Sequence, residues 1–260
     1  MNEIANSISP LLDESAEAVD LSKATTAIFY SISNTQPGLK GVSFGDSLIK
    51  RVVETLRADF PKLKTFATLS PIPGFRGWLQ KNAGRMLEAT PEKMRAQLGR
   101  AVGFEPAGAE HVLSALELMP TLPEKSALRQ WLQGCAAHYL GKELGEARPI
   151  DPVARFHLGN GARVEQINWA ADMSGKGVKQ SYGLMVNYLY DLRKIDRHRQ
   201  ALAHAMPLLN WRSRLVLASS RLPMLSVRIM KSCSRLRLTR CAKMAAGLMR
   251  ARMTMPSSAP

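Results

Sequence analysis

The sequence predicts a mixed α/β (α+β) fold, with strands in the first and last parts of the globular region and helices between them. Three observations carry this prediction. Residues 26–75 read as strand, glycine-rich turn, amphipathic helix and second strand. Residues 77–144 have the apolar spacing of successive helices, and residues 163–190 contain two further strands. A chain of 260 residues is long enough to bury a substantial core.

The first part predicts a parallel βαβ unit. Its first strand lies at Ala27–Ser33, where β-branched and aromatic residues dominate. Asn34–Gly38 ends this strand, because proline donates no ladder hydrogen bond and glycine tolerates a positive φ. Apolar residues at helical spacing then continue to Phe60, and Thr65–Leu69 forms the second strand. We expect an exposed serine, Ser70, where this second strand ends.

The turn that leads into the helix has the composition of an anion-binding site. The first N–H groups of a helix lack internal partners and carry partial positive charge, and glycines let the backbone approach an anion closely. Two interpretations stay open: a phosphate or pyrophosphate site to which the lysine adds charge, or a tight structural turn. The turn consists of Lys40, Gly41, Val42, Ser43, Phe44, Gly45 and Asp46.

Helices are predicted throughout residues 77–144, and Pro91 and Pro123 suit the first turns of two of them. His111 and His138 lie on these helices and receive no role, because a histidine on a helix surface is usually solvated or packed. The three cysteines (Cys135, Cys233 and Cys241) are scattered and odd in number. They predict neither a disulfide framework nor a metal site.

Downstream, two glycines flank Asn160 and indicate a turn. Arg163–Trp169 alternates as a strand, Gly177–Gly183 reads as a loop, and Leu184–Tyr190 reads as a final strand. His157 therefore lies just before a turn that feeds a strand. Its position alone fits a structural hydrogen bond as well as a catalytic role.

Nearly all of the net charge of +15 lies at the C-terminal end of the chain. From residue 193 onward, 15 basic residues face one acid, which leaves 21 basic and 20 acidic residues for residues 1–192. For the basic tail, residues 204–260, three interpretations compete: an amphipathic helix for a membrane surface or partner, a nucleic-acid arm, or disordered, non-native sequence from a frame error. We favour the last interpretation, a disordered, non-native sequence.

No apolar run predicts a membrane span, and no N-terminal segment predicts a secretory signal. We therefore expect a cytoplasmic protein.

Four segments resemble the malonyl-CoA decarboxylase family. They are FYSISNTQPGLKGVSFGDSLIKRVV from Phe29, FATLSPIPGFRGWL from Phe66, DPVARFHLGNGARVEQINWAADMS from Asp151, and GLMVNYLYDL from Gly183. The resemblance covers about residues 24–200. It implies a mixed sheet like that of Gcn5-related acyltransferases, within a catalytic domain at residues 24–203 that carries a helical insertion at about 77–150. Residues 1–23 are a leader helix or linker in this scheme.

The chain departs from the family pattern at its N-terminus. The family's helical N-terminal domain and the first strands of its catalytic domain precede the point where this chain begins. We therefore expect an incomplete sheet whose early strands are missing and whose edge is exposed. We therefore also expect low solubility and weak or absent activity for this chain.

The resemblance implies decarboxylation of malonyl-CoA to acetyl-CoA and CO2, a carboxy-lyase reaction of fatty acid metabolism that needs no cofactor and no metal. Ser70 and His157 match the family's catalytic serine and histidine. The turn Lys40–Asp46 matches its malonyl-CoA-binding loop, and Ser31 and Tyr190 match positions that line the pocket. The expected partner is malonyl-CoA, without nucleic acid or membrane, and a homo-oligomer stays open.

Two alternatives from other functional classes remain. A plain acyl-CoA N-acyltransferase would use the same turn and sheet without the Ser70 and His157 pair. The interpretation as a non-enzymatic, basic nucleic-acid-binding protein depends on the basic tail, residues 204–260, alone.

Overall fold

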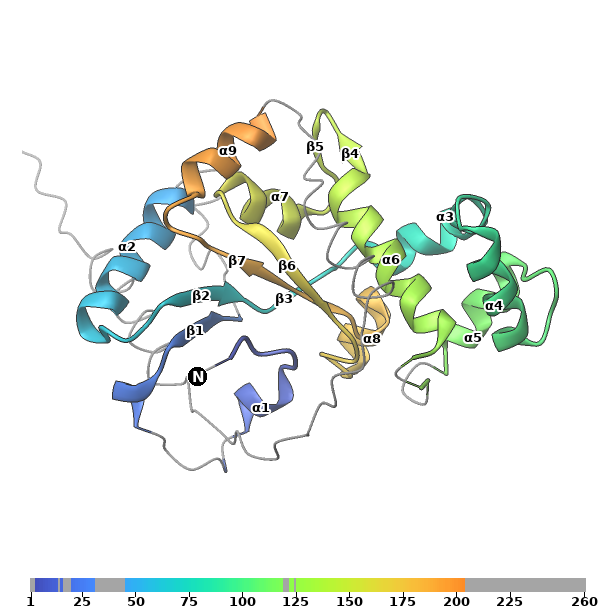
Figure 1. The fold of residues 1–260 in the computed structure, drawn as a ribbon, viewed down its shortest axis with the longest axis horizontal. Coiled ribbons are helices and arrows are strands. Elements are labelled where there is room, and N and C mark those ends of the chain that lie inside the picture. The colour runs from blue at the N-terminus through green and yellow to red at the C-terminus, as the bar shows by residue number, and fades with distance from the viewer. Residues whose placement is uncertain are drawn as a thin grey trace, which may run out of the picture.

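The computed structural model (Figure 1) describes residues 3–13, 15, 20–30, 45–118, 122, 123 and 125–203. The basic tail and most of the glycine-rich turn lie outside these residues. The first half of the described chain contains α1 (Ser9–Leu12), the 3₁₀ helix η1 (Leu21–Lys23), β1 (Thr26–Phe29), α2 (Gly45–Asp59), β2 (Thr65–Thr68), β3 (Ser70–Pro71), α3 (Phe75–Glu88), α4 (Glu92–Val102) and α5 (Ala109–Leu116). The second half contains α6 (Ala127–Lys142), β4 (Leu144–Gly145), β5 (Arg148–Pro149), α7 (Pro152–Gly159), β6 (Arg163–Asn168), α8 (Gly175–Ser181), β7 (Met185–Leu189) and α9 (Ile195–Ala203).

Among the described residues, the larger sheet is mixed and has five strands. β1 and β2 run parallel, and the predicted βαβ unit β1–α2–β2 is confirmed. β7 lies between β2 and β3 on one side and β6 on the other, antiparallel to all three. The last strand in sequence therefore lies inside the sheet. That position brings β7 against the end of β2, where the predicted serine is found.

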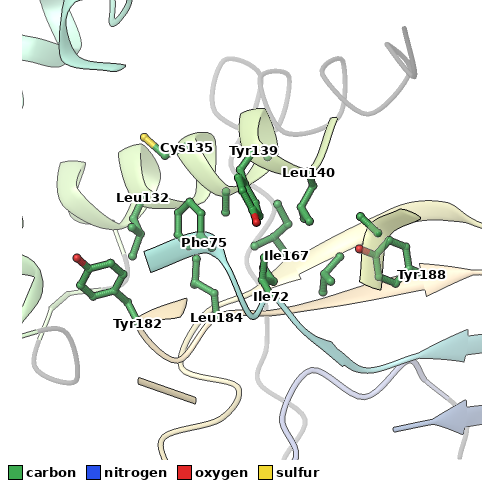
Figure 2. Packing of buried hydrophobic residues seen from close by; sticks show 14 of the residues in the cluster. Ile72, Phe75, Leu132, Cys135, Tyr139, Leu140, Ile167, Tyr182, Leu184 and Tyr188 are labelled. Carbon is green, nitrogen blue, oxygen red and sulfur yellow. The ribbon is translucent and has the colours of Figure 1, made fainter. Parts of the chain in front are cut away.

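Helices cover one face of this sheet, and the N-terminal segment covers the other (Figure 1). On the helical face, side chains of α3, α6 and α7 form one cluster with Ile72 and Tyr188 (Figure 2). On the opposite face, Ala5 and Leu11 pack with Ala67 and Met185. Full burial of a leucine, isoleucine or methionine side chain, such as Leu11, Ile72 or Met185, stabilises the fold by about 1.5–3 kcal/mol. The N-terminal residues are thus part of the described core.

Two predictions of local structure are wrong. Of residues 177–183, those up to Ser181 belong to α8 rather than to a loop, because Ser174 caps the helix by accepting from the N–H of Gly177. Pro123 lies outside α6, which begins at Ala127 with Ser126 as its capping residue. In both helices the serine cap supplies a start signal that the apolar spacing does not contain.

Within the described residues, no helix has both the length and the apolar character needed to cross a membrane. The helical segment predicted for residues 77–144 is confirmed as α3 to α6, which extend to one side of the sheet (Figure 1).

Candidate active site

The short helix α7 holds His157 against the sheet. Asp151 caps this helix: its Oδ1 accepts from the N–H of Val153 (3.0 Å) and of Ala154 (2.8 Å). Pro152 occupies the first turn, where its missing N–H costs nothing. The sequence predicted only the turn that follows. The helix places the side chain of His157, 3% exposed, in its last turn.

Beyond α7 the chain turns sharply at Gly161, which has φ +80°. A Cβ at this position would lie 2.5 Å from the carbonyl oxygen of Ile195. Only glycine suits a residue that has both a left-handed backbone and a neighbour this close. The glycines around Asn160 therefore make the turn that the sequence indicated, and this turn fixes the end of α7 against the start of α9.

The structure brings together three of the predicted site residues. Ser70 Oγ lies 3.2 Å from His157 Nε2, although 87 residues separate them in sequence. The other ring nitrogen, Nδ1, lies 2.8 Å from the hydroxyl of Tyr190. Both contacts are within hydrogen-bonding distance and are buried. A serine, a histidine and a tyrosine thus form one continuous chain of hydrogen bonds.

The prediction that Ser70 is exposed is wrong. The residue is 5% exposed, because the chain does not leave the sheet at the end of β2. It continues as β3, in which Ser70 pairs with Val186 of β7. A substrate group that reaches Ser70 must therefore enter a largely buried space.

Thr68 and Tyr188 adjoin this chain of hydrogen bonds, and the sequence pattern predicted a role for neither of them. Thr68 Oγ1 lies 2.8 Å from Ser70 Oγ. The ring of Tyr188 stacks on that of His157, with centroids 4.5 Å apart and planes at 25°. A period-two reading would have found both, since Thr68 and Ser70, like Tyr188 and Tyr190, are two residues apart in extended chain and so face the same way.

Burial dominates the titration of the site. It lowers the pKa of His157 from its ordinary 6.5 to about 3, so the ring is neutral at pH 7. Burial also raises the pKa of Tyr190 and that of Tyr188. At neutral pH the site therefore consists of uncharged hydrogen-bonding groups in an apolar setting. A negative charge that enters it meets no fixed counter-ion among these three residues.

The remaining predicted residues are placed only in part. Gly45 and Asp46 begin α2, as expected for a turn that feeds a helix, but only their backbone is described. Ser31 and the segment Lys40–Phe44 lie outside the described residues. Across the part of the chain that the structure describes, no three His, Cys, Asp or Glu side chains gather as metal ligands would.

Comparison with known proteins identifies the family. The sequence profile described as malonyl-CoA decarboxylase C-terminal domain matches residues 1–210. The chain belongs to the malonyl-CoA decarboxylase family. The match starts at residue 1 and ends at 210, so it extends beyond the residues 24–200 over which the motifs were recognised, and it includes the N-terminal segment that packs on the sheet.

Curated relatives and solved structures agree with this family. The chain is 40% identical to mitochondrial malonyl-CoA decarboxylase of Anser anser anser over 201 residues, which are 74% of this chain and 40% of that enzyme. The values for Mus musculus are 40% over 204 residues, 74% and 41%. The crystal structure of malonyl-CoA decarboxylase from Cupriavidus metallidurans matches with a TM-score of 0.68 and 47% identity, over 79% of this chain and 50% of that one. For Rhodopseudomonas palustris the TM-score is 0.63 and the identity 42%, over 78% and 44%. The chain thus spans about two-fifths of the length of these curated relatives.

Proposed function

We propose that this chain decarboxylates malonyl-CoA to acetyl-CoA and CO2, a carboxy-lyase reaction of fatty acid metabolism. The observation that carries the proposal is the buried hydrogen-bonded chain of Ser70, His157 and Tyr190. Membership of the malonyl-CoA decarboxylase family supports it. The proposal includes a Gcn5-related type of sheet, a cytoplasmic location and malonyl-CoA as the partner.

The reaction needs a proton donor beside a developing carbanion. When CO2 leaves, the electron pair of the broken C–C bond moves onto the α-carbon and delocalises into the thioester carbonyl as an enolate. A proton must then reach that carbon, and hydrogen-bond donors that favour the enolate over the substrate lower the barrier. Ser70 is the group that would hydrogen-bond the malonyl carboxylate or thioester, and His157 Nε2 is the adjoining donor.

The low pKa of the free histidine fits this role once substrate charge is considered. Burial keeps His157 neutral in the free protein. The malonyl carboxylate would bring a negative charge next to the ring, which favours the protonated form and opposes the effect of burial. The ring takes up one proton from solvent on binding. It gives the Nε2 proton to carbon after CO2 has left, and so returns to its neutral state.

The coenzyme A part of the substrate has a separate site in this proposal. The turn of Lys40, Gly41, Val42, Ser43, Phe44, Gly45 and Asp46 would hold its phosphates at the start of α2. What supports this is the position of α2 directly after the turn, since a helix N-terminus favours negative charge. Ser31 would line the same pocket.

Release of labelled CO2 tests the proposal. Purified protein is incubated with malonyl-CoA that carries ¹⁴C in its free carboxyl group, without any amine acceptor. We expect labelled CO2, formed at a low rate, and an equal amount of acetyl-CoA. His157→Gln should lower kcat by about 10²- to 10⁴-fold, the usual contribution of a general acid. His138→Gln is the matched control, because His138 lies on α6 with Glu143 as its partner and should leave kcat unchanged.

Two outcomes would contradict the proposal. If wild-type protein forms no CO2 from malonyl-CoA alone but consumes acyl-CoA when amines are added, the chain is an acyl-CoA N-acyltransferase. If His157→Gln and His138→Gln turn over malonyl-CoA equally, His157 is not the proton donor.

A further inference from the structure

Thr68 lies where the backbone ladder between β2 and β7 is interrupted. Ala67 pairs with Leu189 and Ser70 pairs with Val186, so the same register places Thr68 opposite Tyr188. The backbone N–H of Tyr188 donates to the side-chain Oγ1 of Thr68 (3.2 Å). The carbonyl oxygen of Thr68 instead accepts from the side chain of Asn187 (2.7 Å). The hydroxyl of Thr68 thus stands in for a backbone acceptor, which holds it in one orientation between the two strands.

The distances around Ser70 favour one direction for its single hydroxyl hydrogen. Ser70 Oγ is 2.8 Å from Thr68 Oγ1 and 3.2 Å from His157 Nε2. A distance of 2.8 Å is the usual length for O–H···O, whereas 3.2 Å is at the long end for a hydroxyl donor but within the range for N–H···O. Thr68 Oγ1 has two lone pairs, of which the N–H of Tyr188 takes one. The other is available to Ser70.

We propose that Thr68 is a positioning residue: it accepts the hydroxyl hydrogen of Ser70 and thereby fixes the proton of the neutral His157 ring on Nε2. In the free protein, Ser70 Oγ gives its hydrogen to Thr68 and accepts from Nε2–H. The bare Nδ1 then accepts from the hydroxyl of Tyr190, 2.8 Å away. All hydrogen bonds in the chain run in one direction, from Tyr190 through His157 and Ser70 to Thr68. When substrate binds, the malonyl carboxylate or thioester would replace Thr68 as the acceptor of the Ser70 hydrogen.

This direction has a chemical consequence, which rests on the proposed function. The ring enters the reaction with a proton already on the nitrogen that adjoins Ser70. The proton taken up with substrate adds at Nδ1, and the Nε2 proton goes to carbon. The neutral ring is then left with its proton on Nδ1 and returns to the Nε2–H form by proton exchange with solvent once the product leaves. No bond to Thr68 itself forms or breaks. Without an acceptor at Thr68, the hydrogen of Ser70 would turn toward Nε2, and the neutral ring would carry its proton on Nδ1 instead.

The proton position can be measured without any turnover. The two neutral tautomers of histidine give different ¹⁵N shifts and couplings in NMR spectra of the full chain labelled with ¹⁵N-histidine. The chain has five histidines, and the signal of His157 is the one lost in His157→Gln. We expect the Nε2–H tautomer in the wild type and in Thr68→Ser, which keeps the hydroxyl. We expect the Nδ1–H tautomer in Thr68→Val, which keeps the shape of the side chain and removes the acceptor.

Kinetics with malonyl-CoA give the second measurement. Thr68→Val should lower kcat by about tenfold or more while KM changes by no more than about twofold, since the defect lies in proton delivery. Thr68→Ser should restore kcat to within about threefold of wild type. Thr65→Val, the same substitution at the start of β2, is the matched control and should match wild type in both constants.

The outcomes separate this inference from the proposed function. An Nδ1–H tautomer in the wild type overturns the role of Thr68 even if Thr68→Val fails to fold. So does a Thr68→Val enzyme with wild-type kcat, or a Thr68→Ser enzyme as slow as Thr68→Val. If the wild type releases no CO2 but shows the Nε2–H tautomer, the proposed reaction fails and the hydrogen-bond direction stands.

Discussion

Tyr188 lies on β7, and Tyr190 lies just beyond the end of that strand. The two tyrosines should respond differently to loss of their hydroxyl groups. Tyr190→Phe removes the hydroxyl that contacts His157 Nδ1 at 2.8 Å. Tyr188→Phe removes a buried hydroxyl that has no hydrogen-bond partner among the described residues. Both substitutions remove one oxygen and keep the ring, so Tyr188 is a control for Tyr190 in the same setting. Stacking of Tyr188 on His157 is retained, because it depends on the ring.

The magnitudes follow from hydrogen bonding in a buried site. Loss of the Tyr190 hydroxyl leaves a buried ring nitrogen without its partner, which costs about 1–3 kcal/mol. If that cost falls on the transition state, kcat drops by about 5- to 150-fold. Tyr188 is fully buried, and keeping a hydroxyl there without a hydrogen bond is itself unfavourable. Tyr188→Phe should therefore unfold at the same urea concentration as wild type or at a higher one.

The assay combines malonyl-CoA turnover with urea unfolding followed by circular dichroism. We expect Tyr190→Phe to be slower and less stable, and Tyr188→Phe to match wild type in kcat. Equal losses of kcat in the two variants would refute the reasoning, because they would show that the contact with Nδ1 does not matter. A marked loss of stability in Tyr188→Phe would show that its hydroxyl has a partner after all.

Two further predictions concern stability. The pKa of His157 is about 3 in the folded protein, compared with its ordinary value of 6.5 in the unfolded chain. Between these two pH values, the unfolded chain binds the proton and the folded protein does not. The contribution of His157 is therefore complete above pH 6.5 and falls by about 1.4 kcal/mol per pH unit as the solution is acidified toward pH 3. Urea unfolding at pH 7, 5.5 and 4 should show a shallower acid loss in His157→Gln, and parallel curves would contradict the assignment. Gly161→Ala should destabilise by more than about 1 kcal/mol, since it combines φ +80° with contact to Ile195, whereas Gly159→Ala, which meets nothing within 4 Å, should be neutral or stabilising. Equal melting temperatures for the two alanine variants would rule out strain at Gly161.

Apolar periodicity in the sequence did not predict the short, capped helices α7 and α8. The βαβ unit and strands β6 and β7 were predicted because their apolar patterns are local and regular. α7 and α8 have eight and seven residues. Isolated helices of that length are marginal in water, so caps and tertiary contacts stabilise them rather than their own sequence pattern. Asp151 and Ser174, the two capping residues, were the available signals.

The sequence by itself determined the order of strands and helices, the parallel pair β1–β2 and the residues Ser70, His157 and Tyr190 as candidates. It did so because strand and helix periods, turn residues and family motifs are written within short stretches of chain. Only the tertiary structure decided that Ser70 is buried, that it meets His157, and that Thr68 replaces a backbone acceptor. Those facts depend on the insertion of β7 between β2 and β6, a contact across more than a hundred residues that no local pattern encodes.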